Sequence, residues 1–288
     1  MSRFQSPADV KERLAAVKYL ADDDAAVTVY LADRLEKPIL CEGPAGVGKT
    51  ELAKGIAAIT GHRLIRLQCY EGLDEAKALY EWNYKKQLLR IQADSGDRVW
   101  RAVEHDIFTE EFLLARPLLA AIRSPDPVVL LIDEVDRVEV ETEALLLEVL
   151  SEWQVSIPEL GTVAATRPPL VVLTSNNTRE LSEALKRRCL FLHMNYPDVE
   201  RETRIIRARI PEIDAAFADR VARVVRSIRA LDLKKAPSVA ETLDWARTLL
   251  LLGVETVDAE ATRRTLSILL KYQQDIERAS AELAAQGT

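Results

Sequence analysis

The feature that most constrains the fold of this chain is a glycine-rich stretch of eight residues. It fits the pattern G-x-x-x-x-G-K-S/T in full and reads Gly43-Pro44-Ala45-Gly46-Val47-Gly48-Lys49-Thr50. A short apolar run, residues 38–41, precedes it, and a helical pattern with Leu52, Ile56 and Ile59 near one face follows. Glycines let the backbone wrap around an anion with its N–H groups pointing inward, and the helix adds its positive N-terminal dipole. The sequence therefore predicts a loop that binds the phosphates of a nucleotide.

The end of this stretch carries the side chains expected to contact the nucleotide. Lys49 is long enough to reach the β- and γ-phosphates, and the Thr50 hydroxyl can be a ligand of Mg²⁺. We include the next residue, Glu51, in the nucleotide-binding segment. ATP and Mg²⁺ are therefore the expected cofactors, and hydrolysis of ATP to ADP and phosphate is the expected reaction.

Two carboxylates end a second apolar run, residues 128–132. Ligands of α/β proteins bind at the carboxyl ends of such strands. We expect Asp133 to help hold Mg²⁺, and Glu134 to orient and deprotonate the attacking water. The alternative is a solvent-exposed helix cap, for which Asp is a favoured residue; beside a complete phosphate loop we favour the catalytic interpretation.

A third apolar run, residues 170–174, is followed by Ser175, Asn176 and Asn177. An amide at this point can hydrogen-bond the γ-phosphate or the attacking water. Asn-Asn is also a common turn former. The residues alone leave both interpretations of Asn176 open.

Strand and helix patterns alternate through the first two thirds of the chain. Strand candidates lie at 38–41, 64–67, 128–132, 170–174 and 190–194, and helical patterns include 110–122 and 140–153. This alternation predicts an α/β domain with a five-stranded, mainly parallel sheet over residues 1–196. Residues 217–231 and 239–250 repeat apolar positions at helical spacing, and one long helix is expected from about Asp258 into the tail. Residues 197–288 are therefore expected to form a smaller, all-helical domain.

Charge and composition exclude several other classes of protein. The net charge of −7 gives no reason to expect binding to nucleic acid or to an anionic membrane. Cys41, Cys69 and Cys189 are far apart and read as free thiols of a reducing compartment, and the three histidines, at 62, 105 and 193, form no zinc-binding pattern. No secretory signal or stretch long enough to span a bilayer is present, so a soluble, cytoplasmic protein is expected.

The phosphate loop, the acidic pair and the strand-ending asparagine together resemble the AAA+ ATPases, and more narrowly the MoxR family. The resemblance implies that Asn176 is the sensor-1 residue and that the all-helical domain is the lid of an AAA+ core. The segment 183–189 resembles the arginine-finger region, with Arg188 as the favoured finger and Arg187 as the alternative. A basic helix end in solvent is the other interpretation of both arginines.

Several stretches are most similar to the CoxD branch of that family. They are Cys41–Glu51, Arg66–Gly72, Leu79–Tyr84 and Leu185–Cys189. The resemblance implies a homo-hexameric ring with ATP at subunit interfaces, and a chaperone-like role in maturing metalloenzymes. The client implied is a molybdenum hydroxylase-like enzyme with the copper–molybdenum centre of carbon monoxide dehydrogenase, and a partner with a von Willebrand factor A domain is usual.

The MoxR resemblance also implies a β-hairpin before sensor 1 that tends to face the pore of the ring. Residues 154–157 and 162–164, with a turn at 159–161, fit such a hairpin. One position departs from the family, because Ala240 stands where many relatives carry a lid arginine called sensor 2. Lys234, Lys235 or Arg247 are candidates to replace it.

Two other functions compete with this interpretation. The main alternative is a nucleic-acid-associated AAA+ motor or loader, which should carry a basic surface or a DNA-binding segment. The acidic balance of this chain speaks against it. A kinase with a phosphate loop fits poorly with a helical C-terminal domain and an Arg-Arg pair before the last strand.

Overall fold

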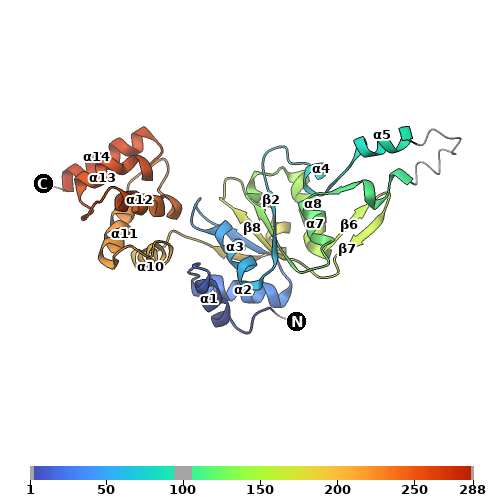
Figure 1. The fold of residues 1–288 in the computed structure, drawn as a ribbon, viewed down its shortest axis with the longest axis horizontal. Coiled ribbons are helices and arrows are strands. Elements are labelled where there is room, and N and C mark those ends of the chain that lie inside the picture. The colour runs from blue at the N-terminus through green and yellow to red at the C-terminus, as the bar shows by residue number, and fades with distance from the viewer. Residues whose placement is uncertain (1–2, 94–105, 287–288) are drawn as a thin grey trace. The chain divides into compact units, whose positions relative to one another are not determined.

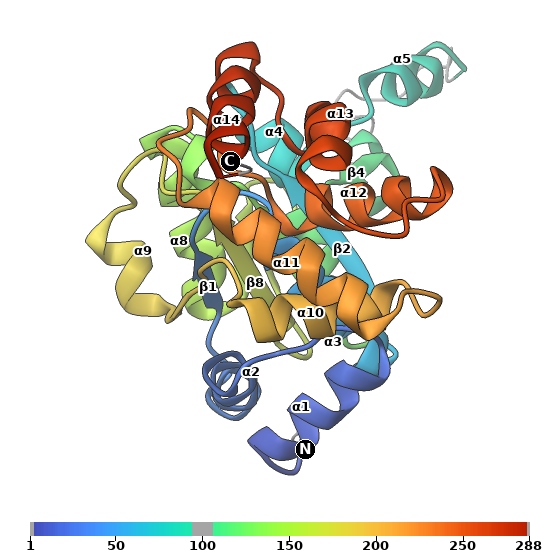
Figure 2. The same cartoon turned by 90° about the vertical axis from the view of Figure 1, so that its left-hand side faces the viewer.

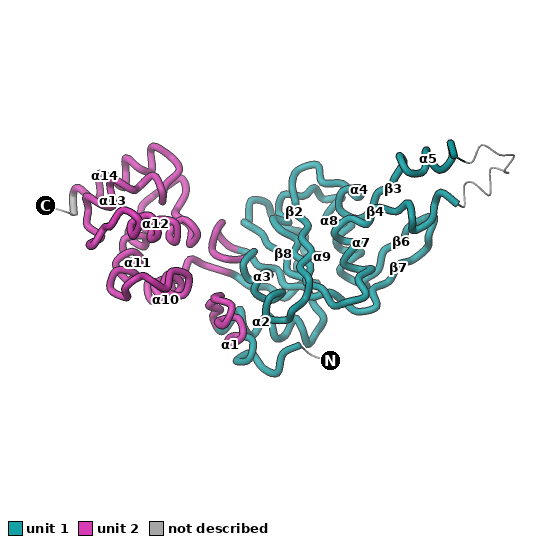
Figure 3. The backbone as a smooth tube through the Cα atoms, viewed as in Figure 1, with its two compact units in different colours: residues 1–10, 23–42, 50–193 teal, residues 11–22, 43–49, 194–288 magenta. Residues whose placement is uncertain are grey.

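The computed structural model describes residues 3–93 and 106–286, and the chain divides into two compact units. One unit holds residues 1–10, 23–42 and 50–193, and the other holds residues 11–22, 43–49 and 194–288 (Figure 3). The division after residue 193 groups the phosphate loop with the C-terminal helices. The domain boundary expected at 196/197 stays a prediction. His105, one of the three histidines, lies outside the described residues.

The first unit is built on the expected parallel sheet, so the α/β class is confirmed (Figure 1). Its five strands lie in the order β2-β5-β8-β1-β9, and all neighbouring strands run parallel. Their bounds are Ile39–Glu42 (β1), Arg63–Gln68 (β2), Val128–Asp133 (β5), Leu170–Ser175 (β8) and Leu190–His193 (β9). Every residue of β5 and β8 is buried, as expected for central strands covered on both faces.

Helices cover both faces of this sheet because right-handed crossovers between parallel strands place them there. Figure 1 shows α3 on one face and α7 and α8 on the other. The helices in the described residues before position 194 are α1 (Pro7–Ala16), α2 (Asp23–Leu35), α3 (Lys49–Thr60), α4 (Glu75–Ala78), α5 (Tyr84–Ala93), α7 (Pro117–Ile122), α8 (Val140–Glu152) and α9 (Glu183–Arg188). Short 3₁₀ turns lie at Glu110–Phe112 (η1) and Val135–Arg137 (η2).

Two antiparallel strand pairs form separate two-stranded sheets. The expected hairpin is confirmed, because β6 (Gln154–Ile157) pairs with β7 (Gly161–Ala164). The helix expected over 110–122 is wrong: Leu113–Ala115 forms strand β4, which pairs with β3 (Tyr80–Trp82), and α7 begins only at Pro117. Proline has no N–H and favours the first position of a helix, so it sets this start. Trp82 is buried and packs edge-on against Phe108 at 5.2 Å, which explains the aromatic stretch by packing.

In the second unit, residues 195–286 form five helices. They are α10 (Val199–Arg209), α11 (Ala215–Arg229), α12 (Val239–Leu251), α13 (Ala259–Leu269) and α14 (Gln273–Gln286). Figure 2 shows α10 and α11 side by side, and they are in contact. The single long helix expected from Asp258 is wrong, because the chain leaves the helical conformation at Leu270 and α14 packs back against α13. The core of this unit centres on Trp245, which is fully buried. Of the helices in the described ranges, none has the length and apolar character needed to cross a membrane.

Candidate nucleotide-binding site

Asp133, the last residue of β5, receives hydrogen bonds from three side chains on three different elements. Thr50 Oγ1 in the first turn of α3 donates to Oδ1 over 3.0 Å, and Thr174 Oγ1 on β8 donates to the same oxygen over 2.6 Å. Arg66 on β2 donates to Oδ2 over 2.5 Å. These partners offset the cost of burying the carboxylate, which is 3% exposed. The structure thus brings together Thr50 and Asp133, the two predicted Mg²⁺ ligands, and their oxygen donors are of the kind that Mg²⁺ prefers.

Glu134 follows directly and has the left-handed backbone conformation, with φ 59° and ψ 48°. A non-glycine residue pays about 1 kcal/mol or more for this conformation, so its surroundings must hold it there. The Glu134 N–H donates to Thr174 Oγ1 over 2.9 Å, and its carboxylate pairs with Arg137 over 2.9 Å. The side chain is 34% exposed, so the carboxylate is accessible to water. This access is what a general base for water requires.

Asp136 fixes the backbone that carries the predicted sensor. Its Oδ2 accepts hydrogen bonds from the Asn176 N–H (3.2 Å), the Thr178 N–H (2.9 Å) and the Thr178 hydroxyl (2.6 Å). Burial by itself raises the pKa of Asp136, but these hydrogen bonds outweigh it and lower the pKa below the usual value. The main chain of Asn176 is therefore held beside η2, one residue beyond the end of β8.

The phosphate loop lies in the second unit. Lys49 is buried, and its ammonium donates to the carbonyl oxygens of Gly43 over 2.6 Å and Pro44 over 2.8 Å. Gly43 has φ 152°, and a Cβ there would lie 2.0 Å from the Met194 carbonyl oxygen. The loop thus curls around the lysine with a backbone that only glycine permits at this position. Glu51 forms an ion pair with Lys54 of the same helix over 2.7 Å.

Arg187 and Arg188 are both exposed at the C-terminal end of α9. Arg188 Nε donates to the Ser151 hydroxyl of α8, and Nη1 donates to the Ala184 carbonyl over 3.2 Å. These partners lie on α8 and α9 rather than in the Asp133 cluster. A finger acting on a neighbouring copy would have to leave them.

The lid cations considered as substitutes for sensor 2 have partners elsewhere. Lys234 lies over the ring of Tyr272 at 4.1 Å, and Lys235 pairs with Glu241 over 3.5 Å. Arg247 pairs with Asp244 over 3.3 Å on the surface of α12. The Ala240 side chain is exposed.

Sequence reasoning missed Arg66 and Thr174, which bond to the acidic pair, and Asp136, which holds the main chain at Asn176. The signal for Arg66 was its position two residues before the end of β2, but using it requires knowing that β2 pairs with β5. Cys69, just after β2, is buried, and its burial and the neighbouring carboxylates raise the pKa of its thiol to about 12. A raised pKa keeps this thiol protonated near neutral pH, so Cys69 is not an activated nucleophile. Cys41 and Cys189 are also thiols rather than halves of disulfides.

The fold and the arrangement of these residues define an AAA+ ATPase domain with a helical lid. Two mutant structures of RuvB from Thermotoga maritima have the same fold, with 18% sequence identity to this chain. The first covers 92% of this chain and 71% of the RuvB chain with a TM-score of 0.53. The second covers 92% and 70% with a TM-score of 0.51.

More particularly, residues 38–189 match the AAA domain of the dynein-related subfamily, and the chain belongs to this family. Similar curated proteins include uncharacterised proteins of Staphylococcus aureus strains COL and RF122, each 24% identical over 274 residues, or 90% of this chain and 95% of the relative. An uncharacterised protein of Staphylococcus haemolyticus is 24% identical over 252 residues, or 84% and 87%. None of these three relatives has a functional name, so the MoxR and CoxD resemblance stays a prediction.

Proposed function

We propose that this protein hydrolyses ATP with Mg²⁺ and uses the energy to remodel a client protein in the cytoplasm. The observation that carries the proposal is the 3.0 Å hydrogen bond from Thr50, the last residue of the phosphate-loop motif, to Asp133, the first of the acidic pair. Residues of the loop and of the strand-end carboxylates are the two parts that such hydrolysis requires. Thr50 and Asp133 are 83 positions apart in the chain, so their hydrogen bond supports the proposal.

Each side chain has a distinct task in this proposal. The loop amides and Lys49 bind the phosphates, and Thr50 and Asp133 hold Mg²⁺, which neutralises charge that develops on the phosphate oxygens. Glu134 takes a proton from the attacking water, and it must release Arg137 to do so. Asn176 orients that water from the loop that Asp136 fixes.

We further propose a MoxR-type role, in which a homo-hexamer and a partner with a von Willebrand factor A domain mature a metalloenzyme. The client best supported by the CoxD-like stretches is a molybdenum-containing oxidase of the carbon monoxide dehydrogenase type. This proposal rests on the sequence resemblance to the MoxR family, because function does not follow from fold alone. The hairpin of β6 and β7 supports it, since this chain forms the element that the resemblance implies.

Trapping the client tests the remodelling role most simply. Glu134→Gln should bind ATP without turning it over, and it should retain a client during co-purification from the host. Lys49→Ala, which lacks the cation of the phosphate loop, is the matched control and should retain none. Deleting the gene should leave the oxidase synthesised, inactive and short of metal.

A fully metallated, active oxidase in the deletion strain would remove the maturation role. ATPase activity that rises with DNA and not with protein would support a nucleic-acid motor instead. Size-exclusion chromatography with and without ATP would test the ring, since a nucleotide-dependent hexamer is expected and a persistent monomer would contradict it.

A further inference from the structure

The first turn of α12 lies directly against the phosphate loop, and both belong to the second unit. The Val239 N–H donates a hydrogen bond to the Gly46 carbonyl oxygen over 3.1 Å. A Cβ on Gly46, which has φ 75°, would lie 2.2 Å from the Ser238 Cβ. Only glycine allows this approach of helix and loop. The contact therefore joins the lid to the centre of the predicted phosphate site through the main chain.

This first turn is held rigidly by a reciprocal cap. The Ser238 hydroxyl accepts from the Glu241 N–H over 3.2 Å, and the Ser238 N–H donates to Glu241 Oε2 over 2.7 Å. Such a capping box satisfies two backbone donors at once and fixes the direction of the helix start. The position of Ser238 against Gly46 is therefore set by the helix and does not depend on a mobile side chain.

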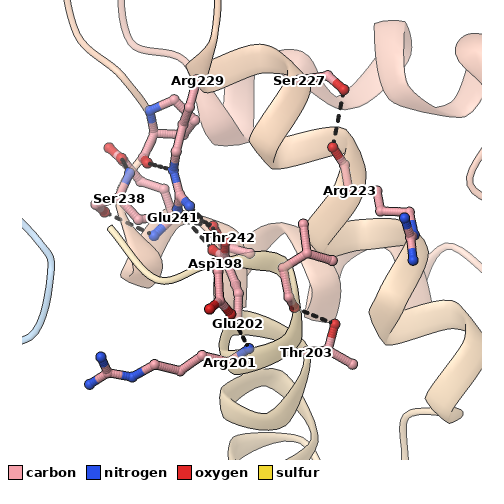
Figure 4. A network of polar contacts seen from close by, with 12 residues as sticks. Asp198, Arg201, Glu202, Thr203, Arg223, Ser227, Arg229, Ser238, Glu241 and Thr242 are labelled. Atoms are coloured by element: carbon pink, nitrogen blue, oxygen red, sulfur yellow. Dashed lines mark hydrogen bonds and ion pairs between the residues drawn. The ribbon is translucent and has the colours of Figure 1, made fainter. Parts of the chain in front are cut away.

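The side chain of Arg229 also contacts the start of α12 (Figure 4). Arg229, the last residue of α11, donates from Nε to the Pro237 carbonyl oxygen over 2.8 Å. Its other nitrogens form two bonds, of 2.6 and 2.8 Å, to the Glu202 carboxylate of α10. Thr242 on α12 donates to the same carboxylate over 2.9 Å. The Arg229 guanidinium thus connects α11 with α10 and with the start of α12, the turn that contacts Gly46.

Arg229 and Glu202 form a buried ion pair. The two side chains are 8% and 1% exposed, and a buried ion pair is often no more stabilising than apolar residues of similar volume. Its distinctive property is geometry, because a planar guanidinium fixes several acceptors at once. Here those acceptors include the carbonyl directly before Ser238.

We propose that Arg229 is a positioning residue that holds the first turn of α12 on Gly46 and so ties the conformation of the phosphate loop to the lid helices. This inference rests on the proposed binding of nucleotide by residues 43–49. Through this main-chain contact the lid helices can affect nucleotide binding. The contact lies at the start of the helix that carries Ala240, where the MoxR resemblance implies an arginine.

Arg229→Lys tests the proposal with little change of charge. Lysine keeps a cation beside Glu202. It lacks the planar set of N–H donors with which arginine binds the Pro237 carbonyl and both carboxylate oxygens together. Arg223→Lys on the same helix is the matched control, because Arg223 is exposed and pairs only with Asp219 in the contacts that we describe. Hydrogen exchange without nucleotide should accelerate at least about threefold in residues 237–242 and in loop residues 43–50. Affinity for a fluorescent ATP analogue should fall about threefold to tenfold, as expected for one lost hydrogen bond.

A purely structural role for Arg229 gives a different result. Exchange would then accelerate in residues 237–242 while loop exchange and nucleotide affinity stayed at the parent values, which would overturn the proposal. If the fluorescence of Trp245, which is buried in the parent protein, shows that Arg229→Lys is misfolded, Glu241→Ala provides the same test. It removes the carboxylate half of the capping box and leaves the Arg229–Glu202 ion pair in place. A parent protein that binds no nucleotide contradicts the proposed function alone, because the exchange comparison is made without nucleotide.

Discussion

Arg66 on β2 places its guanidinium 2.5 Å from the Asp133 carboxylate at the end of β5. The two strands are neighbours in the sheet, and Gln68 and Asp133 are partners in their register. A cation from this chain therefore already faces the carboxylate that we expect to hold Mg²⁺. Arg66 reduces the negative charge that this carboxylate offers to a second cation.

Replacing Arg66 by Gln should strengthen Mg²⁺ binding. Half of the Arg66 side chain is exposed, so the ion pair is worth about 1 kcal/mol or less and the effect should be about two- to fivefold. The measurement is the Mg²⁺ concentration that gives half-maximal nucleotide binding. Arg63→Gln, at the opposite end of the same strand, is the control and should leave this concentration unchanged. Weaker Mg²⁺ binding in Arg66→Gln would mean that Arg66 orients Asp133 instead of competing for it.

Thr178→Val should destabilise the protein near neutral pH and have little effect in acid. The Thr178 hydroxyl helps to lower the pKa of Asp136, so the stability it adds is fully present above the usual aspartate pKa, near pH 4. That stability is lost as the pH falls through the lowered pKa. We expect a loss of about 1 kcal/mol at pH 7, because the acceptor is a carboxylate but the donor residue, Thr178, is exposed.

Thermal unfolding from pH 7 to pH 3 measures this effect. The difference in Tm between parent and Thr178→Val should shrink as the pH falls. Thr248→Val is the control, because its hydroxyl bonds a main-chain carbonyl, and its difference should not depend on pH. An equally large difference for Thr178→Val at both ends of the range would refute the role of Asp136.

The sheet and the hairpin could be predicted because each of their strands has a recognisable local sequence pattern. Continuous apolar runs predicted β5 and β8, which are buried on both faces. The turn expected at 159–161 separated the two hairpin strands, and the structure places this turn at 158–160. The segment 110–122 was not predictable, since Leu113–Ala115 becomes a strand only by pairing with residues more than 30 positions earlier. The apolar content of this segment is equally compatible with a helix, and the pairing with β3 determines that residues 113–115 form a strand.

The site residues that belong to a contiguous sequence motif could be predicted. Those whose contacts depend on the order and register of the strands could not. Thr50, Asp133 and Glu134 stand in recognisable local patterns. Arg66 and Asp133 are 67 positions apart, and their contact follows from strand order. Arg229 has no local signature at all, because its partners lie on two other helices.

Arg188→Ala should bind ATP nearly as well as the parent and hydrolyse it far more slowly, if this guanidinium acts on the nucleotide of a neighbouring subunit. Arginine fingers contribute about a thousandfold or more to turnover. Mixing Arg188→Ala with Lys49→Ala subunits should restore part of the activity, because each supplies what the other lacks. Ser151→Ala is the control for lost packing, since it removes the hydroxyl that Arg188 bonds in its own chain and leaves the guanidinium in place. Confirmed co-assembly without recovery would exclude Arg188 and make Arg187 the next candidate.

The most direct test of the account is the turnover of ATP by Glu134→Gln at saturating ATP and Mg²⁺. Glutamine keeps the size of the side chain but cannot accept a proton from water, so nucleotide affinity should stay near the parent value. The rate should fall about a hundredfold or more, as expected for loss of a general base. Lys49→Ala, which should lose tight ATP binding, separates lost binding from lost chemistry. Hydrolysis by Glu134→Gln at the parent rate would contradict the assignment of Glu134 and the proposed active site with it.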